Sequence, residues 1–458
     1  MTHLFEQFMA AIRNRLKRGG GARNEGRELD LGLRVTDSEV TRRHVTLTRT
    51  QRTMHVAVLG KTGTGKSSLL RYLCAQDIEA DRGFLFFDLH GDATPFLLRT
   101  INARERRLRR HLSDKLVLID PADSLVSVGL NPLAQTLPPD FVRIAEFAEV
   151  LKERWSLDRF GARTDELLRN TLYALSANGF TLLELGPFLA RRAFRIPCLK
   201  RVHNPEIRAY FEARYDSLSD AMQAVMREPI LNKTSAFTAD PRFRHIVGQA
   251  RSTFSLREAL DEGYWIIVDL DKGRLGGEAI TFGSLVLTML KNALFTREHR
   301  TLFTVYCDEI QNFIAFHGGI ETMLSEARKF GVAMITANQF LDQYPPETRA
   351  AILAAGTHVF FQLSSVDAWH IAQALDGARR LAELLKNLPR RYFVLKSGSE
   401  RWLEGRVPHV LPPNADYTDL LNRSRYRFGR ARALVEREIA ERRALAERKP
   451  DELLHEWE

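Results

Sequence analysis

Short hydrophobic runs recur along the chain and alternate with amphipathic segments, and several of them end in glycine or an acidic residue. Continuous apolar runs of this kind are typical of strands buried on both faces of a parallel sheet. They occupy residues 56–59, 84–87, 116–119, 265–270, 302–307, 332–336, 358–363 and, less distinctly, 391–395. Because strands that alternate with helices need crossover connections, the pattern predicts an α/β fold with a largely parallel sheet.

Helical periodicity without a strand signal predicts an all-helical domain, residues 140–235, inserted into the α/β domain. The α/β domain then comprises residues 31–139 and 236–415. Ahead of this domain, the sequence pattern of residues 1–30 predicts an amphipathic helix followed by a glycine-rich linker. Residues 416–458 predict a charged, basic helix at the other end.

The length and composition narrow the class of protein. With 458 residues, the chain can form several domains and bury a large core. No apolar stretch reaches the ~18–20 residues of a spanning helix, and no signal-peptide core is present, so a cytoplasmic location is expected. The three cysteines (Cys74, Cys198 and Cys307) are too scattered for a disulfide framework or a zinc cage.

The charge is basic, with a net value of +10. Such an excess favours a polyanionic partner, either nucleic acid or an anionic membrane surface, although a solvated basic surface fits equally well. Arginine-rich segments at residues 104–110 and 423–449 are candidates for phosphate contacts. Residues 423–449 hold ten Arg or Lys against four Glu, yet each segment is equally compatible with a solvated helix face.

A phosphate-binding loop is the clearest motif. The P-loop pattern G-x-x-x-x-G-K-[ST] is matched at every fixed position by Gly60, Lys61, Thr62, Gly63, Thr64, Gly65, Lys66 and Ser67, and Ser68 continues into a helix. Glycines let the backbone wrap around phosphates, and the N–H groups at the helix start form an anion nest. Lys66 is expected to reach the β- and γ-phosphates and the Ser67 hydroxyl to ligate Mg²⁺, so ATP and Mg²⁺ are the predicted cofactors.

A carboxylate pair at another strand end is the predicted partner of this loop. Asp308 and Glu309 follow the hydrophobic run at 302–307. Asp308 is expected to hold Mg²⁺ and Glu309 to act as the general base on the attacking water. Acidic residues also close the runs before Asp88, Asp120 and Asp269, but only the doublet is followed by a strand that ends in an amide, Gln339, suited to sensing the γ-phosphate.

Further motifs then follow in a fixed order. With the P-loop they make the chain resemble the FtsK–HerA superfamily of RecA-like motor ATPases, and within it the conjugative coupling proteins of the TraG/TraD type. The matching segments, which cover roughly residues 50–400, are Gly60–Ser67, Phe87–Asp92, Leu130–Leu133, Gly248–Ser252, Asp308–Phe313, Ser325–Gly331 and Asn338–Gln339. The resemblance implies a RecA-like motor domain with an all-helical insertion that faces substrate, a relaxase, or accessory or secretion-channel proteins.

The resemblance also implies a homo-hexameric ring with ATP at the subunit interfaces. It places an arginine finger, which completes the active site of the neighbouring subunit, at Arg328. A guanidinium there can stabilise charge on the transferring phosphoryl group. Lys329 and Arg251 are rivals for this role, and Arg328 can instead be a surface arginine paired with Glu326.

The chain also departs from the family pattern. Coupling proteins of this type begin with transmembrane helices, which this sequence lacks, and the roughly 50 residues before the strand at 56–59 are too few for the HerA-type N-terminal barrel. Any membrane contact is therefore expected to be peripheral, at the inner face of the cell membrane. It would run through the basic helix of residues 1–18 or through a partner.

The function predicted from these features is an ATP-driven DNA translocase of conjugative transfer or type IV secretion. Whether the DNA is single- or double-stranded stays open. A protein-handling secretion or assembly ATPase is an alternative, in which the helical insertion grips a polypeptide. Another is a HerA-like DNA-processing motor that works with a separate nuclease. A scaffold that binds ATP without turnover is disfavoured by Glu309, because binding alone needs no second carboxylate.

Overall fold

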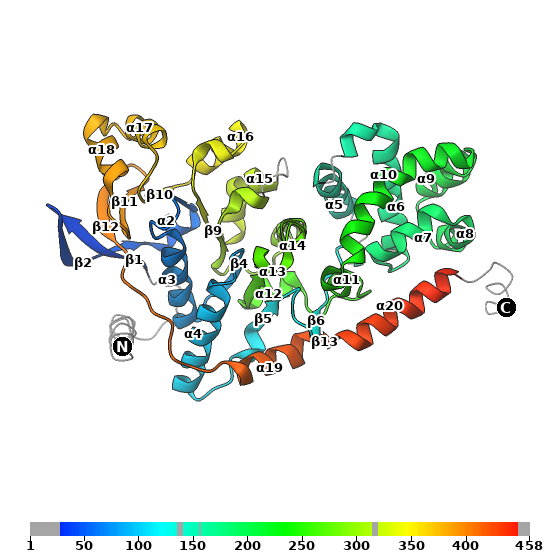
Figure 1. Cartoon of the computed structure of the whole chain (residues 1–458), viewed down its shortest axis with the longest axis horizontal. Coiled ribbons are helices and arrows are strands. Elements are labelled where there is room, and N and C mark those ends of the chain that lie inside the picture. Colours follow the sequence, from blue (N-terminus) through cyan, green and yellow to red (C-terminus); the bar gives the residue numbers. More distant parts are fainter. Residues whose placement is uncertain (1–27, 135–140, 155–156, 314–318, 448–458) are drawn as a thin grey trace. The chain divides into compact units, whose positions relative to one another are not determined.

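The computed structural model describes residues 28–134, 141–154, 157–313 and 319–447. The predicted N-terminal helix and most of its linker lie outside these residues. The chain forms two compact units (Figure 1). The first contains the stretch up to Leu118 together with Leu256–Gly273 and Ala293–Ser424, and the second contains Ile119–Ser255, Arg274–Asn292 and the stretch from Arg425.

An eleven-stranded sheet with the order β2-β1-β12-β11-β10-β3-β9-β8-β4-β7-β5 forms the core of the first unit. Its strands are β1 (Leu29–Thr36), β2 (Glu39–Leu47), β3 (Val56–Leu59), β4 (Gly83–Asp88), β5 (Leu116–Ile119), β7 (Trp265–Asp269), β8 (Phe303–Cys307), β9 (Val332–Asn338), β10 (Thr357–Phe360), β11 (Tyr392–Ser397) and β12 (Leu403–Arg406). The neighbours from β10 through β3, β9, β8 and β4 to β7 pair in parallel. The predicted largely parallel α/β fold is confirmed.

An antiparallel extension adjoins the parallel strands. Here β10 pairs with β11, β11 with β12, β12 with β1 and β1 with β2, all antiparallel. The hydrophobic pattern predicted β11 but missed β12, whose Leu-Glu-Gly-Arg sequence is short and polar. Its Gly405 lies against the ring of Phe393 on β11, where a Cβ would approach the ring to within 2.3 Å. Packing against the neighbouring strand β11 therefore determines β12 more than the hydrophobic pattern of its own four residues does.

Helices cover the sheet of the first unit, and Figure 1 shows α3 and α4 side by side next to the strands. The helices of this unit are α2 (Arg49–Thr53), α3 (Lys66–Glu79), α4 (Ala93–Leu108), α12 (Leu256–Glu262), α15 (Gly319–Glu326), α16 (Pro346–Leu353), α17 (Ser365–Ala374), α18 (Ala378–Asn387) and most of α19 (Thr418–Phe428). Short helical turns η5 (Ile310–Phe313) and η6 (Ala327–Phe330) follow β8 and α15.

A buried polar cluster joins two of these helices to the sheet. The Arg52 guanidinium of α2 donates hydrogen bonds to the Asp77 carboxylate of α3 and to the Thr304 hydroxyl of β8. The Tyr306 hydroxyl, also on β8, donates to Asp77 at 2.7 Å. Because Arg52 and Asp77 are almost fully buried, removing one partner would leave the other's charge uncompensated in the core. The cluster thereby fixes α3 against β8.

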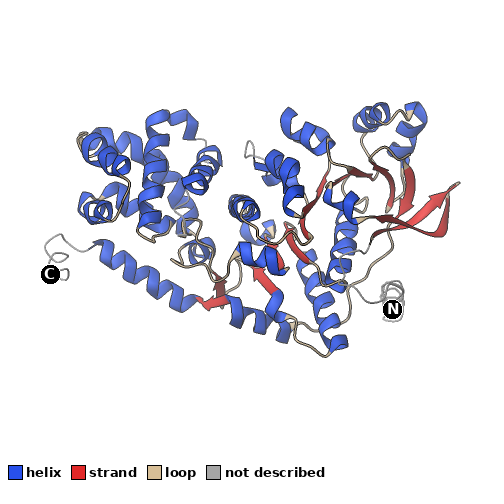
Figure 2. Cartoon of the chain, turned by 180° about the vertical axis from the view of Figure 1, so that it is seen from behind, coloured by secondary structure: helices blue, strands red, loops and turns tan. Residues whose placement is uncertain are grey.

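The second unit is mainly helical, and in Figure 2 the helices α5–α10 form a bundle without strands. Its helices are α5 (Phe141–Arg154), α6 (Ala162–Ala177), α7 (Leu185–Ala190), α8 (Arg192–Lys200), α9 (Pro205–Ala209), α10 (Asp220–Ala239), α11 (Pro241–Val247), α14 (Glu278–Phe295, in large part) and α20 (Arg432–Glu447), while α13 (Lys272–Leu275) lies at the unit boundary. None of the helices within the described ranges has both the length and the hydrophobicity to cross a bilayer.

The basic C-terminal segment is two helices and not the single helix that its composition predicts. Between α19 and α20, β13 (Gly429–Ala431) pairs antiparallel with β6 (Val126–Val128). Gly429 packs closely, because a Cβ there would lie 2.7 Å from the Arg425 carbonyl oxygen and 3.0 Å from a Val126 methyl carbon. A strand partner distant in the sequence interrupts the helix, and the local helical pattern cannot reveal it.

His55 connects the start of the P-loop strand to β9. It has the left-handed backbone conformation, with φ +68°, directly before β3. Its Nδ1 accepts a hydrogen bond of 3.0 Å from the backbone N–H of Met334. Burial lowers the pKa of His55 to about 4, because the charged imidazolium is poorly solvated there.

The His55 contact predicts an acid-sensitive part of the stability. Because the pKa is lower in the folded chain than in the unfolded one, this stabilisation is present above about pH 6.5 and is lost as the pH falls towards about 4. Urea unfolding at about pH 7 and about pH 5 measures the loss. The matched variant is His55→Asn, which keeps an acceptor and tolerates the left-handed backbone. Between about pH 7 and about pH 5, we expect its free energy of unfolding to fall by about 2 kcal/mol less than that of the wild type. An equal loss in both proteins would contradict this prediction.

Candidate active site

The P-loop connects β3 to α3 with glycines where the backbone requires them. Gly63 and Gly65 have positive φ angles of +77° and +128°. At Gly60 a Cβ would lie 2.6 Å from the Cβ of Phe361, so the loop can pass there only without a side chain. The Gly60 N–H donates to the Asn338 carbonyl at 3.2 Å, and the Lys61 N–H donates to the Gln362 carbonyl at 2.8 Å. The two neighbouring strands thereby hold the loop.

The loop presents donors suited to phosphate. Among the described residues, the backbone N–H groups of Gly65, Lys66 and Ser67, at the start of α3, donate no hydrogen bond. Unpaired N–H groups at a helix start carry a partial positive charge, so the loop fits a nucleotide's phosphates. The Lys66 ammonium donates to the Gly60 carbonyl at 2.7 Å, and burial lowers its pKa while Glu309 and Asp308 oppose that shift.

The sheet brings the predicted carboxylates to this loop. Strand β9 lies between β3 and β8, and all three run parallel, so their carboxyl ends meet at one edge. The Ser67 hydroxyl donates to the Asp308 carboxylate at 2.5 Å. Burial raises the pKa of Asp308, and the Ser67 hydrogen bond opposes the rise. A hydroxyl and a carboxylate oxygen are ligands that Mg²⁺ prefers, so this pair fits the ion.

Glu309 lies between amide donors from two elements. The Gln339 amide donates to one of its carboxylate oxygens at 3.0 Å, and the Gln311 amide donates to the other. The backbone of Glu309 is left-handed, with φ +54°, a strained conformation of the sort that recurs at functional sites. The structure thus brings together Lys66, Ser67, Asp308, Glu309 and Gln339, all predicted from sequence.

The other acidic strand ends have local roles. The Asp88 carboxylate accepts hydrogen bonds from the N–H groups of Gly91 and Thr94, at 2.9 and 2.7 Å, which shape the turn after β4. Asp269 accepts from the N–H of Asp271 at 3.2 Å. Asp120 accepts from the N–H of Ala122 at 2.8 Å. These residues organise turns.

Sequence reasoning missed a cation beside Glu309. Lys272 donates to the Asn312 side-chain carbonyl at 2.6 Å, and Asn312 in turn donates to the backbone carbonyl of Glu309 at 2.8 Å. Burial lowers the pKa of Lys272, and the negative charge of Glu309 opposes this shift. The only sequence signal is its place just after the run at 265–270, which is too general to single out a lysine.

Arg328 is exposed on η6. Glu326, the alternative partner considered from sequence, pairs with Lys329 at 3.9 Å. Within the described ranges, no carboxylate pairs with Arg328 and no hydrogen bond joins its guanidinium to another group. The Arg328 guanidinium is therefore exposed and free of ion pairs and hydrogen bonds within the described residues.

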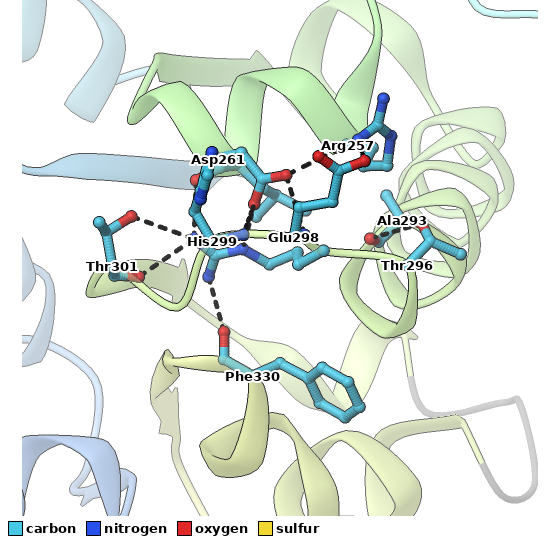
Figure 3. A network of polar contacts seen from close by, with 10 residues as sticks. Arg257, Asp261, Ala293, Thr296, Glu298, His299, Thr301 and Phe330 are labelled. Carbon is cyan, nitrogen blue, oxygen red and sulfur yellow. Dashed lines mark hydrogen bonds and ion pairs between the residues drawn. The ribbon is translucent and has the colours of Figure 1, made fainter.

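A buried arginine, Arg297, holds the segment that carries Arg328. Figure 3 shows the polar contacts that reach Asp261, Thr301 and Phe330 in this network. Arg297 donates to the carbonyl of Phe330 on η6 at 2.8 Å and to the Asp261 carboxylate at 3.1 Å. It also donates to the carbonyls of Leu260 and Thr301, at 2.9 and 3.1 Å. One guanidinium therefore joins η6 to α12 and to the loop before β8.

Several arginines of the two basic segments have carboxylate partners inside the protein. In α4, Arg104 pairs with Asp81 at 3.2 Å and Arg107 pairs with Glu79. Further along, ion pairs of the same kind link Arg423 to Glu105, Arg425 to Asp123, Arg430 to Glu438 and Arg442 to Glu184. These side chains stabilise helix packing, which reduces the case for either segment as the main phosphate-binding surface.

The fold and the site together define a P-loop NTPase of the RecA-like class. A sequence profile described as the central domain of helicase HerA matches residues 35–281, more than half of the chain, and the chain belongs to this family. The predicted FtsK–HerA resemblance and the predicted P-loop ATPase are confirmed, and ATP and Mg²⁺ are the cofactors of this class. None of the curated proteins matches the chain.

Solved structures are similar in fold. Plasmid coupling protein TrwB in complex with a non-hydrolysable GTP analogue is 17% identical, with a TM-score of 0.61 over 87% of this chain and 98% of that one. TrwB with ADP and Mg²⁺ is 16% identical, with the same TM-score of 0.61 and the same coverage of 87% and 98%. VirB4 of Thermoanaerobacter pseudethanolicus is 14% identical, with a TM-score of 0.55 over 85% and 99% of the two chains. At such identities the likeness shows the fold.

The Arg297 contacts predict a large stability difference between two neighbouring arginines. Arg297→Met leaves the buried Asp261 carboxylate without its guanidinium and three carbonyls without a donor, so we expect the free energy of unfolding to fall by about 3–5 kcal/mol. Arg257→Met is the matched control. Arg257 is partly exposed and pairs with Asp261 only at 3.9 Å, so its loss should cost at most about 1 kcal/mol. If urea unfolding gave the same decrease in the free energy of unfolding for both variants, the structural role of Arg297 would be contradicted.

Proposed function

We propose that this protein is an ATP-hydrolysing motor that translocates DNA as a homo-hexameric ring, of the kind that serves conjugative transfer or type IV secretion. The observation that carries the hydrolytic part is the joining of the P-loop to the carboxylates: Ser67 bonds to Asp308, and Gln339 bonds to Glu309. A nucleotide-binding scaffold does not need a second carboxylate held by two amides.

Each residue has one task in this proposal. ATP with Mg²⁺, when bound, supplies the phosphoryl group and the charge that polarises it. Lys66 and the N–H groups at the start of α3 hold the phosphates, with Ser68 the next residue along that helix. Ser67 and Asp308 hold the metal ion.

Glu309 orients the attacking water and accepts its proton. Gln339 is hydrogen-bonded to Glu309, so the state of the γ-phosphate can reach β9 through the carboxylate. Arg328, from the neighbouring subunit, stabilises charge on the phosphoryl group in transfer.

Support for DNA comes from the charge of +10 and from the likeness to the plasmid coupling protein TrwB. Contacts in such a motor reach phosphates and not bases, because translocation must tolerate any sequence. We propose that residues 31–139 and 236–415 form the motor domain and that residues 140–235 form an insertion that meets a relaxase, accessory or channel protein. The setting we propose is cytoplasmic, with at most peripheral membrane contact at the inner face.

A second candidate is a DNA-processing motor that works with a separate nuclease. The match to the HerA central domain favours it. Both candidates share the site chemistry and the DNA substrate and differ only in the partner. The partner retained on purification from the native host distinguishes a relaxase or channel protein from a nuclease.

Steady-state ATP hydrolysis with and without single- and double-stranded DNA tests the proposed function. We expect DNA to stimulate turnover in the wild type and neither Lys66→Ala nor Glu309→Gln to respond. Glu309→Gln removes the base but keeps the shape, so turnover should fall about 10²–10⁴-fold while nucleotide binding is retained. Glu212→Gln, an exposed glutamate on the helical unit, is the matched control and should turn over normally.

The outcomes separate the candidates. Turnover that depends on Glu309 but ignores DNA, and rises with a partner protein, indicates a protein-handling ATPase instead. Full turnover in Glu309→Gln contradicts the assigned base. No turnover under any condition indicates a nucleotide-binding scaffold.

Mixing two inactive variants tests whether Arg328 acts across subunits. Arg328→Ala lacks the finger and should be slowed about 10³–10⁵-fold. Glu309→Gln lacks the base and should be slowed about 10²–10⁴-fold, as above. In a mixed ring, some Arg328→Ala sites lie beside a Glu309→Gln subunit that still supplies its arginine, and activity should return. Lys329→Ala is the neighbouring control and should retain activity. If the mixture hydrolyses ATP no faster than the two variants do separately, Arg328 is not a finger that acts across subunits.

A further inference from the structure

Arg391 lies directly on the P-loop, although it is more than three hundred residues away in the sequence. It is in the short connection between α18 and β11. Its backbone N–H donates to the carbonyl of Thr64 at 2.7 Å. Its φ is +72°, a left-handed conformation that is unfavourable for a non-glycine residue. The surrounding structure therefore holds this residue in place against the loop.

The first atoms of the Arg391 side chain lie next to Gly65, the residue before Lys66. A Cβ placed on Gly65 would lie 3.2 Å from the Cα of Arg391 and 3.4 Å from its Cγ. The arginine stem therefore runs past the same stretch of loop whose N–H groups, at Gly65, Lys66 and Ser67, are unpaired among the described residues. The bare α-carbon of Gly65 gives the stem room to do so.

Like charges surround this arginine. Partial burial lowers the pKa of Arg391, and the positive charges of Arg406 and Arg390 lower it further. Within the part of the chain that the structure describes, no ion pair joins a carboxylate to any of these three guanidinium groups. Positive charges that lie close together without an anionic partner repel one another. A bound anion would relieve the repulsion among these three charges, and the P-loop beside Arg391 is an anion-binding element.

We propose that Arg391 binds the phosphates of the nucleotide from within the same subunit, as a second cation beside Lys66. This rests on the P-loop being the nucleotide site of the proposed function. A guanidinium suits the task, because it stays charged despite its neighbours and can donate two parallel hydrogen bonds to one phosphate. Arg391 is thus distinct from Arg328, which is proposed to act on the neighbouring subunit.

The test measures nucleotide binding and not turnover. Full-length protein is titrated with N-methylanthraniloyl-labelled ATP and ADP, and the dissociation constants are read from fluorescence. Arg391→Gln removes the charge but keeps the backbone N–H that bonds to Thr64. We expect it to weaken binding about 10- to 100-fold, the typical effect of losing a charged hydrogen bond. Arg391→Lys, which keeps a charge, should recover part of the loss.

Arg401→Gln is the matched control. Arg401 is exposed in the turn between β11 and β12, at the other end of the hairpin from Arg391 and Arg406. Arg401→Gln removes the same charge at a site away from the P-loop, so nucleotide binding should not change. Thermal melting guards against misfolding: without nucleotide, Arg391→Gln should melt with the wild type, and labelled ATP should raise its melting temperature less.

The outcomes are separable. Weaker binding of both labelled nucleotides by Arg391→Gln supports a contact with a phosphate that they share, and weaker binding of labelled ATP alone supports a contact with the γ-phosphate. Unchanged binding of both overturns the inference and leaves the proposed function standing. A wild type that binds neither nucleotide contradicts the proposed function itself, together with this inference.

Discussion

The hydrogen bond between the Ser67 hydroxyl and the Asp308 carboxylate is the interaction on which the site depends. It joins the first turn of α3 to the end of β8, although β9 separates β8 from the P-loop strand. That span is possible only because the three strands run parallel and in register, so that their carboxyl ends form one edge. Gln339 then emerges between loop and carboxylate and contacts Glu309. Binding and hydrolytic chemistry therefore meet at a single sheet edge.

Buried polar contacts keep that edge rigid. Arg52 and Asp77 fix α3 to β8, and Arg297 fixes η6 to the loop before β8. Burying such groups is costly unless every charge is paired, so these contacts specify one arrangement more than they add stability. Glu309 and Arg391 both have left-handed backbone conformations, and the Arg391 N–H bonds to the P-loop at Thr64.

Much of the fold was predictable, because its signals are local. The parallel strands are continuous apolar runs, and the P-loop is eight contiguous residues whose pattern is specific to phosphate binding. What failed were features made by partners distant in the sequence. Strand β12 is short and polar, and β13 interrupts a basic helical stretch to pair with β6. The basic segments looked suited to DNA by charge alone, whereas several of their arginines pair with carboxylates inside the protein.

The sequence by itself determined the nucleotide chemistry: the loop, its lysine and serine, and the Asp308–Glu309 pair are contiguous motifs whose meaning does not depend on what surrounds them. Only the tertiary structure decided which groups lie beside them. Lys272 and Arg391 belong to no motif, and they reach Glu309 and the P-loop because strand order and a connection between α18 and β11 carry them there. A local pattern encodes the chemistry of neighbouring residues, whereas proximity across hundreds of residues arises only when the sheet assembles.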